Sequence, residues 1–319
     1  MRTDCAGIGI RRVHSDSGKN MRKIIRIKKN ISEMLPKRNP AGHKGTFGKV
    51  FIYSGSYGSA GCALLAGRAA YRVGAGMVKI SSPECNRIII QTALPEALYD
   101  TGSFAGRMHI LDKWSDVYLA GPGIGTGSES IAQLDALING TGLKPLVLDA
   151  DALTIISSDA GRYLIEDIRR QTSEGRKIIL TPHGGELHRL MKILPTESAE
   201  LNKLSETLSD GPADDDRLPL GIAISKYLGC TVVAKGAITY TISPDKDIVC
   251  NDDCGNSGMG TAGSGDVLAG IIVGLLAQGL DAYSAASYGV RIHAMAGDSA
   301  AKVRGEHGLM AGDIAEFIY

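Results

Sequence analysis

Short aliphatic runs alternate along the chain with longer segments of mixed polarity. Each run ends in glycine, aspartate, histidine or proline, which is typical of buried strands of a parallel sheet that lead into loops. The segments between the runs are long enough for helices, so the pattern predicts repeated strand–helix–strand units. The runs predicted to be strands are residues 50–53, 77–80, 117–120, 146–148, 177–180 and 231–235.

Helices are predicted between and after these strands. The unbroken apolar run at 267–277 predicts a buried helix. Residues 204–218 are acidic and rich in turn formers, so we expect a mobile surface insertion there. The other predicted helices are 61–72, 128–139, 219–228, 282–303 and 308–318, and antiparallel strands are predicted at 239–243 and 247–250.

Polar side chains follow the predicted strands at the points where the strands end. The carboxyl ends of parallel strands lie along one edge of a sheet, and open α/β folds bind their ligands at that edge. We therefore expect a site there. The polar residues that the pattern places at this edge are Asp149, Asp151, His183 and Glu186.

A glycine-rich loop precedes the buried apolar helix. Glycines stand at positions 255, 258, 260, 263 and 265, where they allow a ligand to approach the backbone closely. The unpaired N–H groups and the dipole of a helix N-terminus favour an anion such as phosphate. Asp266 follows at once, and a carboxylate beside a phosphate site indicates a base for phosphoryl transfer to a hydroxyl. Alternatively, Asp266 only complements the helix dipole.

Composition excludes some classes of function. The hydrophobic content of 44% and charged content of 22% are those of an ordinary globular protein, and the net charge of +1 gives no reason to expect nucleic acid or an anionic membrane as a partner. No apolar run is long enough to span a bilayer, and the N-terminus lacks the apolar core of a signal peptide. The six cysteines lack paired CxxC spacing, so we expect a cytoplasmic protein without a zinc site.

The N-terminal region differs from the remainder. Residues 1–20 are polar and aperiodic, so we expect disorder. Residues 21–38 interleave isoleucine with basic residues but no aromatic ones, which favours a solvated edge strand or arm over a nucleic-acid surface. We expect residues 1–35 to be a partly disordered extension and residues 36–319 to be a single domain.

Several motifs occur in one order along the chain. They are HKGTFGKVFIYSGS, GSAGCALLA, GPGIG, LVLDADAL, LTPHGGE, VVAKGAIT and GNSGMGTAGSGDVLAGIIVGLLAQG. From about residue 36 to the C-terminus, the chain resembles the ADP/ATP-dependent NAD(P)H-hydrate dehydratases of the ribokinase-like superfamily. The resemblance implies an α/β, ribokinase-like fold with a mostly parallel central sheet and helices on both faces.

The resemblance also implies an activity. The substrate would be the S epimer of hydrated NADH or NADPH, and its C6 hydroxyl would be phosphorylated by ADP, which gives AMP, or by ATP. Phosphate would then leave in an elimination that restores NADH or NADPH. Mg²⁺ would enter with the nucleotide and not through a dedicated set of protein ligands. The family further suggests a homotetramer, linked in function to a separate NAD(P)H-hydrate epimerase.

Residue roles follow from matching positions. Asp266 would be the catalytic base, and the N–H groups of Gly263, Ser264 and Gly265 would hold the transferred phosphoryl group. Asp149 is a candidate either to assist with Mg²⁺ or to support the site through hydrogen bonds to the residues that bind the reactants. The positions implied for substrate binding are Ala63, Gly123, His183 and Asp266, and those implied for nucleotide binding are Lys235, Gly236, Ala237, Ile238, Thr239 and Gly265.

The sequence departs from the family pattern at two motifs. TGGTGD is replaced by TAGSGD, with Ala262 and Ser264, and TPHPGE by TPHGGE, with Gly184. Ser264 keeps a hydroxyl and an N–H, whereas Ala262 requires an ordinary φ. Two alternative functions stay open: a hydroxyethylthiazole- or sugar-type kinase of the same superfamily, and a nucleotide-binding protein without catalysis. The TPHGGE and HKGTFG motifs favour the dehydratase over the kinase.

Overall fold

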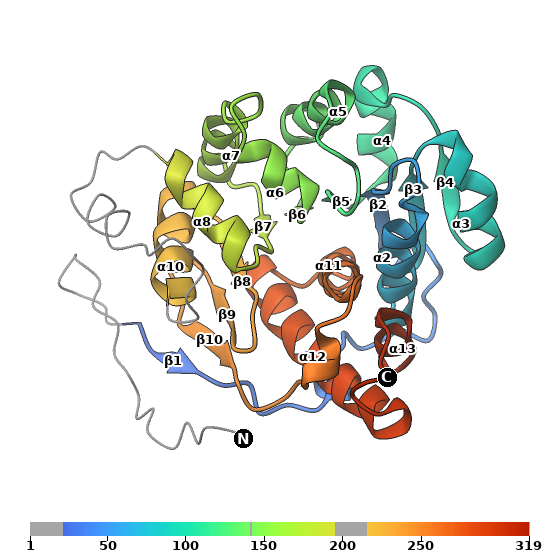
Figure 1. Ribbon diagram of the computed structural model, residues 1–319. Helices are drawn as coiled ribbons and strands as arrows, with labels where there is room; N and C mark the ends of the chain where they lie inside the picture. Colours follow the sequence, from blue (N-terminus) through green and yellow to red (C-terminus); the bar gives the residue numbers. More distant parts are fainter. Residues whose placement is uncertain (1–21, 141, 195–215, 319) are drawn as a thin grey trace.

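The aliphatic runs form one sheet in the computed structural model, which describes residues 22–140, 142–194 and 216–318 (Figure 1). Within these residues the sheet has ten strands in the order β1-β10-β9-β8-β7-β6-β5-β2-β3-β4. All neighbouring strands are parallel except that β9 is antiparallel to β8 and β10. The strands are β1 Ile24–Ile25, β2 Lys49–Tyr53, β3 Met77–Ser81, β4 Leu98–Asp100, β5 Val117–Ala120, β6 Leu146–Leu148, β7 Ile178–Leu180, β8 Thr231–Ala234, β9 Thr239–Ile242 and β10 Ile248–Asn251.

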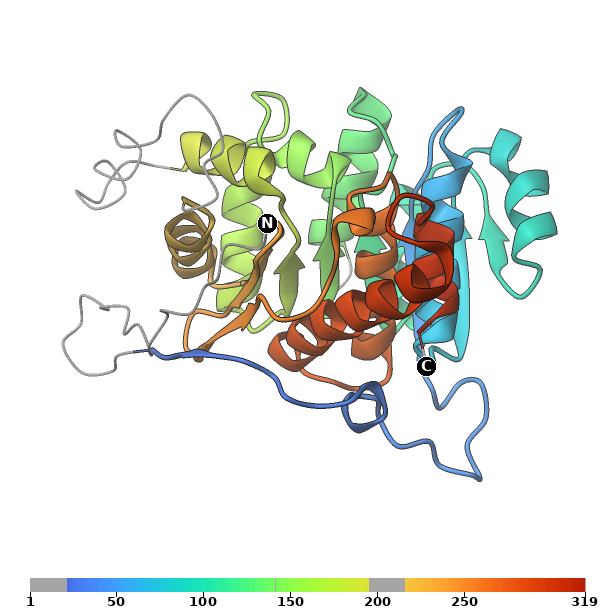
Figure 2. The same cartoon turned by 60° about the horizontal axis from the view of Figure 1, so that its bottom comes forward.

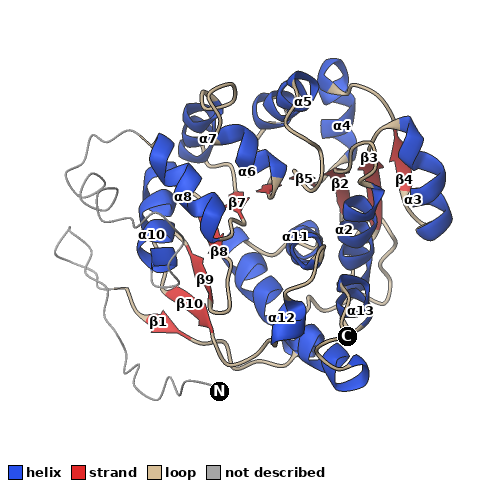
Figure 3. Cartoon of the chain, in the orientation of Figure 1, coloured by secondary structure: helices blue, strands red, loops and turns tan. Residues whose placement is uncertain are grey.

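Helices cover both faces of the sheet, as expected (Figure 3). Side chains alternate along a strand, so Val50 and Ile52 of β2 enter one apolar core while Phe51 and Tyr53 enter the other. The helices in the first core are α2 Ala60–Arg72, α3 Arg87–Ala93, α11 Ser264–Ala277, α12 Ala282–Arg304 and α13 Ala311–Glu316. Those in the second are α4 Met108–Trp114, α5 Ser128–Asn139, α6 Asp151–Ile156, α7 Leu164–Ser173, α8 Gly184–Ile193 and α10 Arg217–Leu228.

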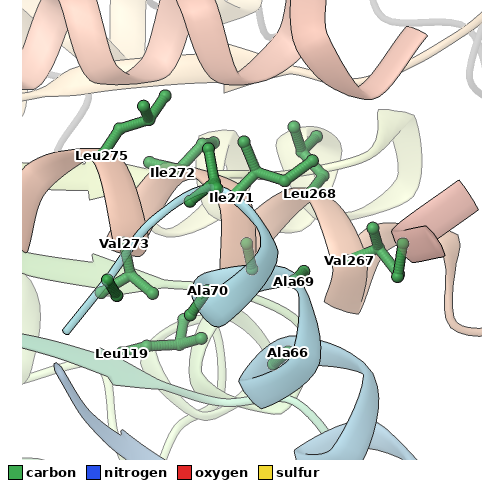
Figure 4. Close-up of a cluster of buried hydrophobic side chains, with 14 of the residues drawn as sticks. Ala66, Ala69, Ala70, Leu119, Val267, Leu268, Ile271, Ile272, Val273 and Leu275 are labelled. Carbon is green, nitrogen blue, oxygen red and sulfur yellow. The ribbon is translucent and has the colours of Figure 1, made fainter. Parts of the chain in front are cut away.

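Helix α11 packs closely against α2 in the first core (Figure 4). Two glycines make this approach possible, because a Cβ at Gly270 would overlap the carbonyl oxygen of Ala66 and one at Gly274 would overlap Val73. The apolar side chains of α11 are buried along nearly its whole length. This packing fixes the direction of α11 and therefore the place of its N-terminus.

Most predicted elements are confirmed to within one or two residues. The basic segment includes the edge strand β1, as expected, but also a short helix that the pattern did not predict, α1 Ile31–Met34. Figure 2 shows the segment that follows β1 running beside α12. In that segment Lys29 Nζ donates a hydrogen bond to the hydroxyl of Tyr288, a residue of α12. The last helix is shorter than predicted, because it begins only at Ala311.

Two expectations concern residues that the structure does not describe. The predicted disorder of 1–20 lies wholly outside the described residues, and the predicted insertion at 204–218 lies outside them up to residue 215. Arg217 and Leu218 belong instead to the first turn of α10. Among the described helices, none combines the length and the apolar character that a membrane span requires.

Candidate active site

The N-terminus of α11 meets the carboxyl ends of the central strands. Asp149 follows β6, His183 follows β7 and Lys235 follows β8, and a bridge pairs the backbones of His183 and Lys235. The structure thus gathers the polar strand ends at one edge of the sheet, as the sequence indicated. Asp266 stands in the first turn of α11, beside these strand ends.

A buried ion pair lies at the centre of this edge. Lys235 Nζ is 2.7 Å from Asp149 Oδ1, and Asp149 is only 1% exposed. Burial alone would lower the pKa of Lys235, but three neighbouring carboxylates, Asp149 first among them, raise it above its ordinary value. Lys235 therefore remains a cation, as binding to a phosphate requires.

The turn that carries Asp149 is strained. Ala150 has a φ of 50°, the one positive φ outside glycine among the described residues. Such strain persists only where the surroundings hold it, and it is common at functional sites. Next to it, Asp151 Oδ2 accepts a hydrogen bond of 2.8 Å from Gly125 N, so this turn also holds the GPGIG loop after β5.

Asp266 has the properties of a base that works near neutral pH. Burial and the nearby Asp149 raise its pKa to about 6, while the Cys62 thiol and Lys235 lower it. Burial and the Asp266 carboxylate raise the pKa of Cys62 to about 12, so its S–H stays protonated beside that carboxylate. An acid with a pKa of about 6 is mostly ionised at pH 7 and can accept a proton.

The backbone at the start of α11 is free to bind an anion. Gly263 has a φ of 87°, and within the described chain the N–H groups of Gly265 and Asp266 have no hydrogen-bond partner. A Cβ at Gly265 would lie 3.4 Å from Lys235 Nζ. Unpaired donors, a helix dipole and an ammonium group thus converge next to Asp266.

Helix α12 supports this loop from behind. His293 Nε2 lies 3.2 Å from Ser264 Oγ, and burial lowers the pKa of His293 to about 4, so its ring is neutral at pH 7. Asp298 accepts hydrogen bonds from Gly255 N and from the side chain of Asn256, at 2.9 and 3.0 Å. Residues of one long helix therefore orient both ends of the glycine-rich loop.

The turn between β8 and β9 forms the rim beside Lys235. Gly236 N donates to Thr239 Oγ1 at 3.3 Å, and that hydroxyl donates to Gly236 O at 3.0 Å. Gly236 and Ala237 are exposed, and Ile238 and Thr239 are half-buried. Five of the six positions that the resemblance implies for nucleotide binding, Lys235 to Thr239, thus form one accessible turn, and the sixth is Gly265 at the start of α11.

His183 caps helix α8. The ring Nδ1 of His183 accepts a hydrogen bond from Gly185 N at 3.0 Å, and the backbone N–H of His183 donates to Glu186 Oε2 at 2.9 Å. Burial and the Lys235 cation lower the pKa of His183, so the contact of 3.4 Å to Glu186 joins a neutral ring to the carboxyl group. The His183 side chain remains 56% exposed beside the ion pair, where a ligand can reach it.

Two other predicted substrate positions differ in their surroundings. Gly123 has a φ of 65°, and a Cβ there would lie 2.8 Å from Cys62 Sγ. Ala63 is fully buried in the first core, so its side chain packs inside the protein. Its neighbour Cys62 is the α2 residue that reaches Asp266, a contact that the sequence did not indicate.

The two departures from the family motifs leave this geometry intact. Ala262 has an ordinary φ, as required of a residue with a side chain, and Gly184 begins α8 without a positive φ. Within the described ranges, no group of three or more histidine, cysteine or acidic side chains is arranged to hold a metal ion.

A mostly parallel sheet, a helix N-terminus with open N–H groups and an adjacent carboxylate are the features of a nucleotide-dependent enzyme with a ribokinase-like fold. The family model described as NAD(P)H-hydrate dehydratase matches residues 50–319. The chain belongs to the NAD(P)H-hydrate dehydratase family.

Known proteins show the same relationship. The chain is 35% identical over 301 residues to the ADP-dependent (S)-NAD(P)H-hydrate dehydratase of Neisseria meningitidis, covering 94% of this chain and 93% of that one. It is 34% identical to a bifunctional NAD(P)H-hydrate repair enzyme of Moorella thermoacetica, over 89% of this chain but 51% of that protein. The ADP/ATP-dependent NAD(P)H-hydrate dehydratase of Bacillus subtilis, co-crystallized with ATP/Mg²⁺, superposes with a TM-score of 0.72 at 27% identity, over 90% and 93% of the two chains.

Proposed function

We propose that this protein dehydrates the S epimer of hydrated NADH or NADPH with ADP as the phosphoryl donor. The observation that carries the proposal is the placement of Asp266, whose raised pKa of about 6 suits a base, next to the open N–H groups of α11. The name of the Neisseria relative supports both the substrate and the use of ADP.

In the proposed reaction Asp266 takes the proton of the C6 hydroxyl as that oxygen attacks the terminal phosphorus of the nucleotide. The bond from phosphorus to the bridging oxygen breaks, and AMP leaves. The C6–O bond of the phosphate ester then breaks with loss of a proton from the neighbouring ring carbon, which restores the double bond and releases phosphate. Phosphorylation matters because phosphate is a far better leaving group than hydroxide.

The remaining residues would bind and orient the reactants. The N–H groups of Gly263, Ser264 and Gly265 would hold the transferred phosphoryl group, and the turn from Lys235 to Thr239 would hold the nucleotide. Gly123 and His183 would border the substrate, with Ala63 contributing only through its backbone. Mg²⁺ bound to the nucleotide phosphates would neutralise charge during transfer, and Asp149 would act through its pair with Lys235.

We also propose that residues 36–319 form the catalytic domain of a cytoplasmic homotetramer, preceded by the extension at 1–35. The family match to residues 50–319 supports most of that domain. The chain spans about half the length of the bifunctional repair enzyme that it resembles, which supports a functional link to an NAD(P)H-hydrate epimerase.

Recovery of reduced-nicotinamide absorbance from hydrated NADH tests the proposal. The assay contains Mg²⁺ and either ADP or ATP, and the substrate includes the S epimer. Recovery with ADP is expected, while recovery with ATP alone would revise only the nucleotide. If folded protein gave no recovery with either nucleotide but phosphorylated a stable alcohol, the kinase alternative would replace the dehydratase.

A further inference from the structure

A hollow of about 520 Å³ opens at the same edge of the sheet, beside β2, β3 and β4. No residue assigned above to the reaction lines it. Its wall is rich in hydroxyl groups and contains two carboxylates, Glu84 and Glu129, but no lysine or arginine. The hydroxyl-bearing residues that line it are Tyr53, Ser56, Ser81, Ser82, Thr101 and Ser130.

This hollow adjoins the active site through the loop after β5. Gly123 faces Cys62, which contacts Asp266, and the next residue, Ile124, lines the hollow. The Ile124 carbonyl also accepts a hydrogen bond of 2.8 Å from Ser130, which lines the hollow next to it. One loop, Gly123 on one side and Ile124 on the other, therefore separates the active site from the hollow.

One buried side chain in the wall has an unused donor. Gln133 is 3% exposed, and its Oε1 accepts from Phe104 N at 3.0 Å, which fixes the amide. Its Nε2 has no hydrogen-bond partner among the described residues. The side chain is almost wholly buried, but Nε2 itself is not sealed from the hollow, so it can donate to a ligand with an acceptor oxygen.

The charges in the wall restrict that ligand. Arg87 pairs with Glu84 at 2.6 Å, but Glu129 has no cationic partner in the described part of the chain. A carboxylate without a cation accepts hydrogen bonds from hydroxyl groups and repels phosphate. A vicinal diol, whose oxygens both donate and accept, satisfies Glu129 and the Gln133 amide together.

We propose that this hollow binds the adenosine ribose of the dinucleotide substrate and selects hydrated NADH over hydrated NADPH. The inference rests on the proposed function, because that function supplies the dinucleotide. In NADPH the 2′-hydroxyl of this adenosine ribose is replaced by a phosphate group. An acidic side chain beside the ribose is a general means of rejecting that phosphate. Glu129 is thus a specificity-determining residue.

The test compares kcat/KM for the two hydrated coenzymes at saturating nucleotide. Wild-type protein should prefer hydrated NADH by about tenfold or more, because the 2′-phosphate of hydrated NADPH would be repelled by the Glu129 carboxylate. Glu129→Lys should reverse this preference, mainly through the KM values of the two hydrated coenzymes. Glu129→Gln should reduce the difference in kcat/KM between them. Glu174→Lys makes the same charge change at an exposed position that does not line this hollow, and it should leave the preference unchanged.

Each result separates the inference from the proposed function. If neither coenzyme is restored, the proposed function fails. If both are restored equally and neither Glu129 variant changes the preference, the function stands but the ribose site is wrong. A change in the KM of ADP instead of the dinucleotide would assign the ribose to the nucleotide and overturn the inference. Binding of intact NADH and NADPH to wild-type protein, followed by fluorescence, gives an independent measure that should show the same preference.

Discussion

Glycines occur at the N-terminal end of α11 and in the packed part that follows it, but their surroundings differ. At the N-terminus a Cβ on Gly265 would lie 3.4 Å from Lys235 Nζ and 3.9 Å from Asp149 Oδ2, so polar groups and open space surround it. Farther along, a Cβ on Gly270 would overlap the Ala66 carbonyl in a fully packed core. The same residue type leaves room for a ligand at one end and for another helix at the other.

The two ends also contribute to stability with opposite signs. Burial of the apolar residues of α11 favours folding. At the N-terminal end, the pKa of Asp266 is raised from 3.8 to about 6 in the folded protein. An acid with a raised pKa gives its most favourable contribution below pH 4, where it is protonated in both states, and that contribution is lost as pH rises through about 6. At neutral pH the ionised Asp266 at the N-terminal end of α11 therefore lowers the stability of the folded protein.

The largest expected effect separates these two contributions. Asp266→Asn should lower the rate by about 10²- to 10⁴-fold, because the base is lost. It should also stabilise the protein at pH 7 by about 1 to 2 kcal/mol, since an amide replaces an ionised carboxylate near Asp149. Coenzyme recovery and urea unfolding measure the two effects. Near pH 4 the gain in stability should vanish, and unchanged turnover at pH 7 would refute the catalytic role.

The reverse pattern is expected at the packed end. Gly270→Ala should destabilise the protein by about 1 to 3 kcal/mol, because α11 and α2 must move apart. Urea unfolding measures this loss, and the folded variant should keep most of its activity at low temperature. Gly312→Ala in α13 is the control, because open space surrounds that position and alanine favours a helix. Equal stability of the two variants would contradict the close packing.

A smaller effect is expected when the same substitution is made at the site end. Gly265→Ala fits without overlap, so the free energy of unfolding should change little. The added methyl group enters the space between the helix N-terminus and Lys235, so the KM for the nucleotide should rise about tenfold. Titration of the nucleotide in the recovery assay measures this. An unchanged KM combined with a large loss of stability would mean that this end, too, is packed against the protein.

Local pattern explains which features could be predicted from the sequence. The strands, α11 and the glycine-rich loop follow from periodicity over a few residues, so they were predicted closely. Contacts between distant segments were not, because they depend on how helices pack. Cys62 reaches Asp266 only because α2 lies against α11, and His293 reaches Ser264 only because α12 crosses behind the loop. Helix α1 has four residues, too few to show a period.

The contact between the helices predicts the smallest effect, on the pH dependence of catalysis. The polar S–H of Cys62 lies beside the ionised Asp266 carboxylate and lowers its pKa against the upward effect of burial. Cys62→Ala removes that donor, so the acid limb of kcat/KM, expected near pH 6, should move upward by about half a pH unit. Cys62→Ser keeps a donor and should not show this upward shift. Profiles of kcat/KM from about pH 5 to about pH 8 for the wild type and both variants measure this shift. A downward shift in the alanine variant would mean that Cys62 acts on Asp266 mainly by excluding water, which would leave the two helices coupled through packing alone.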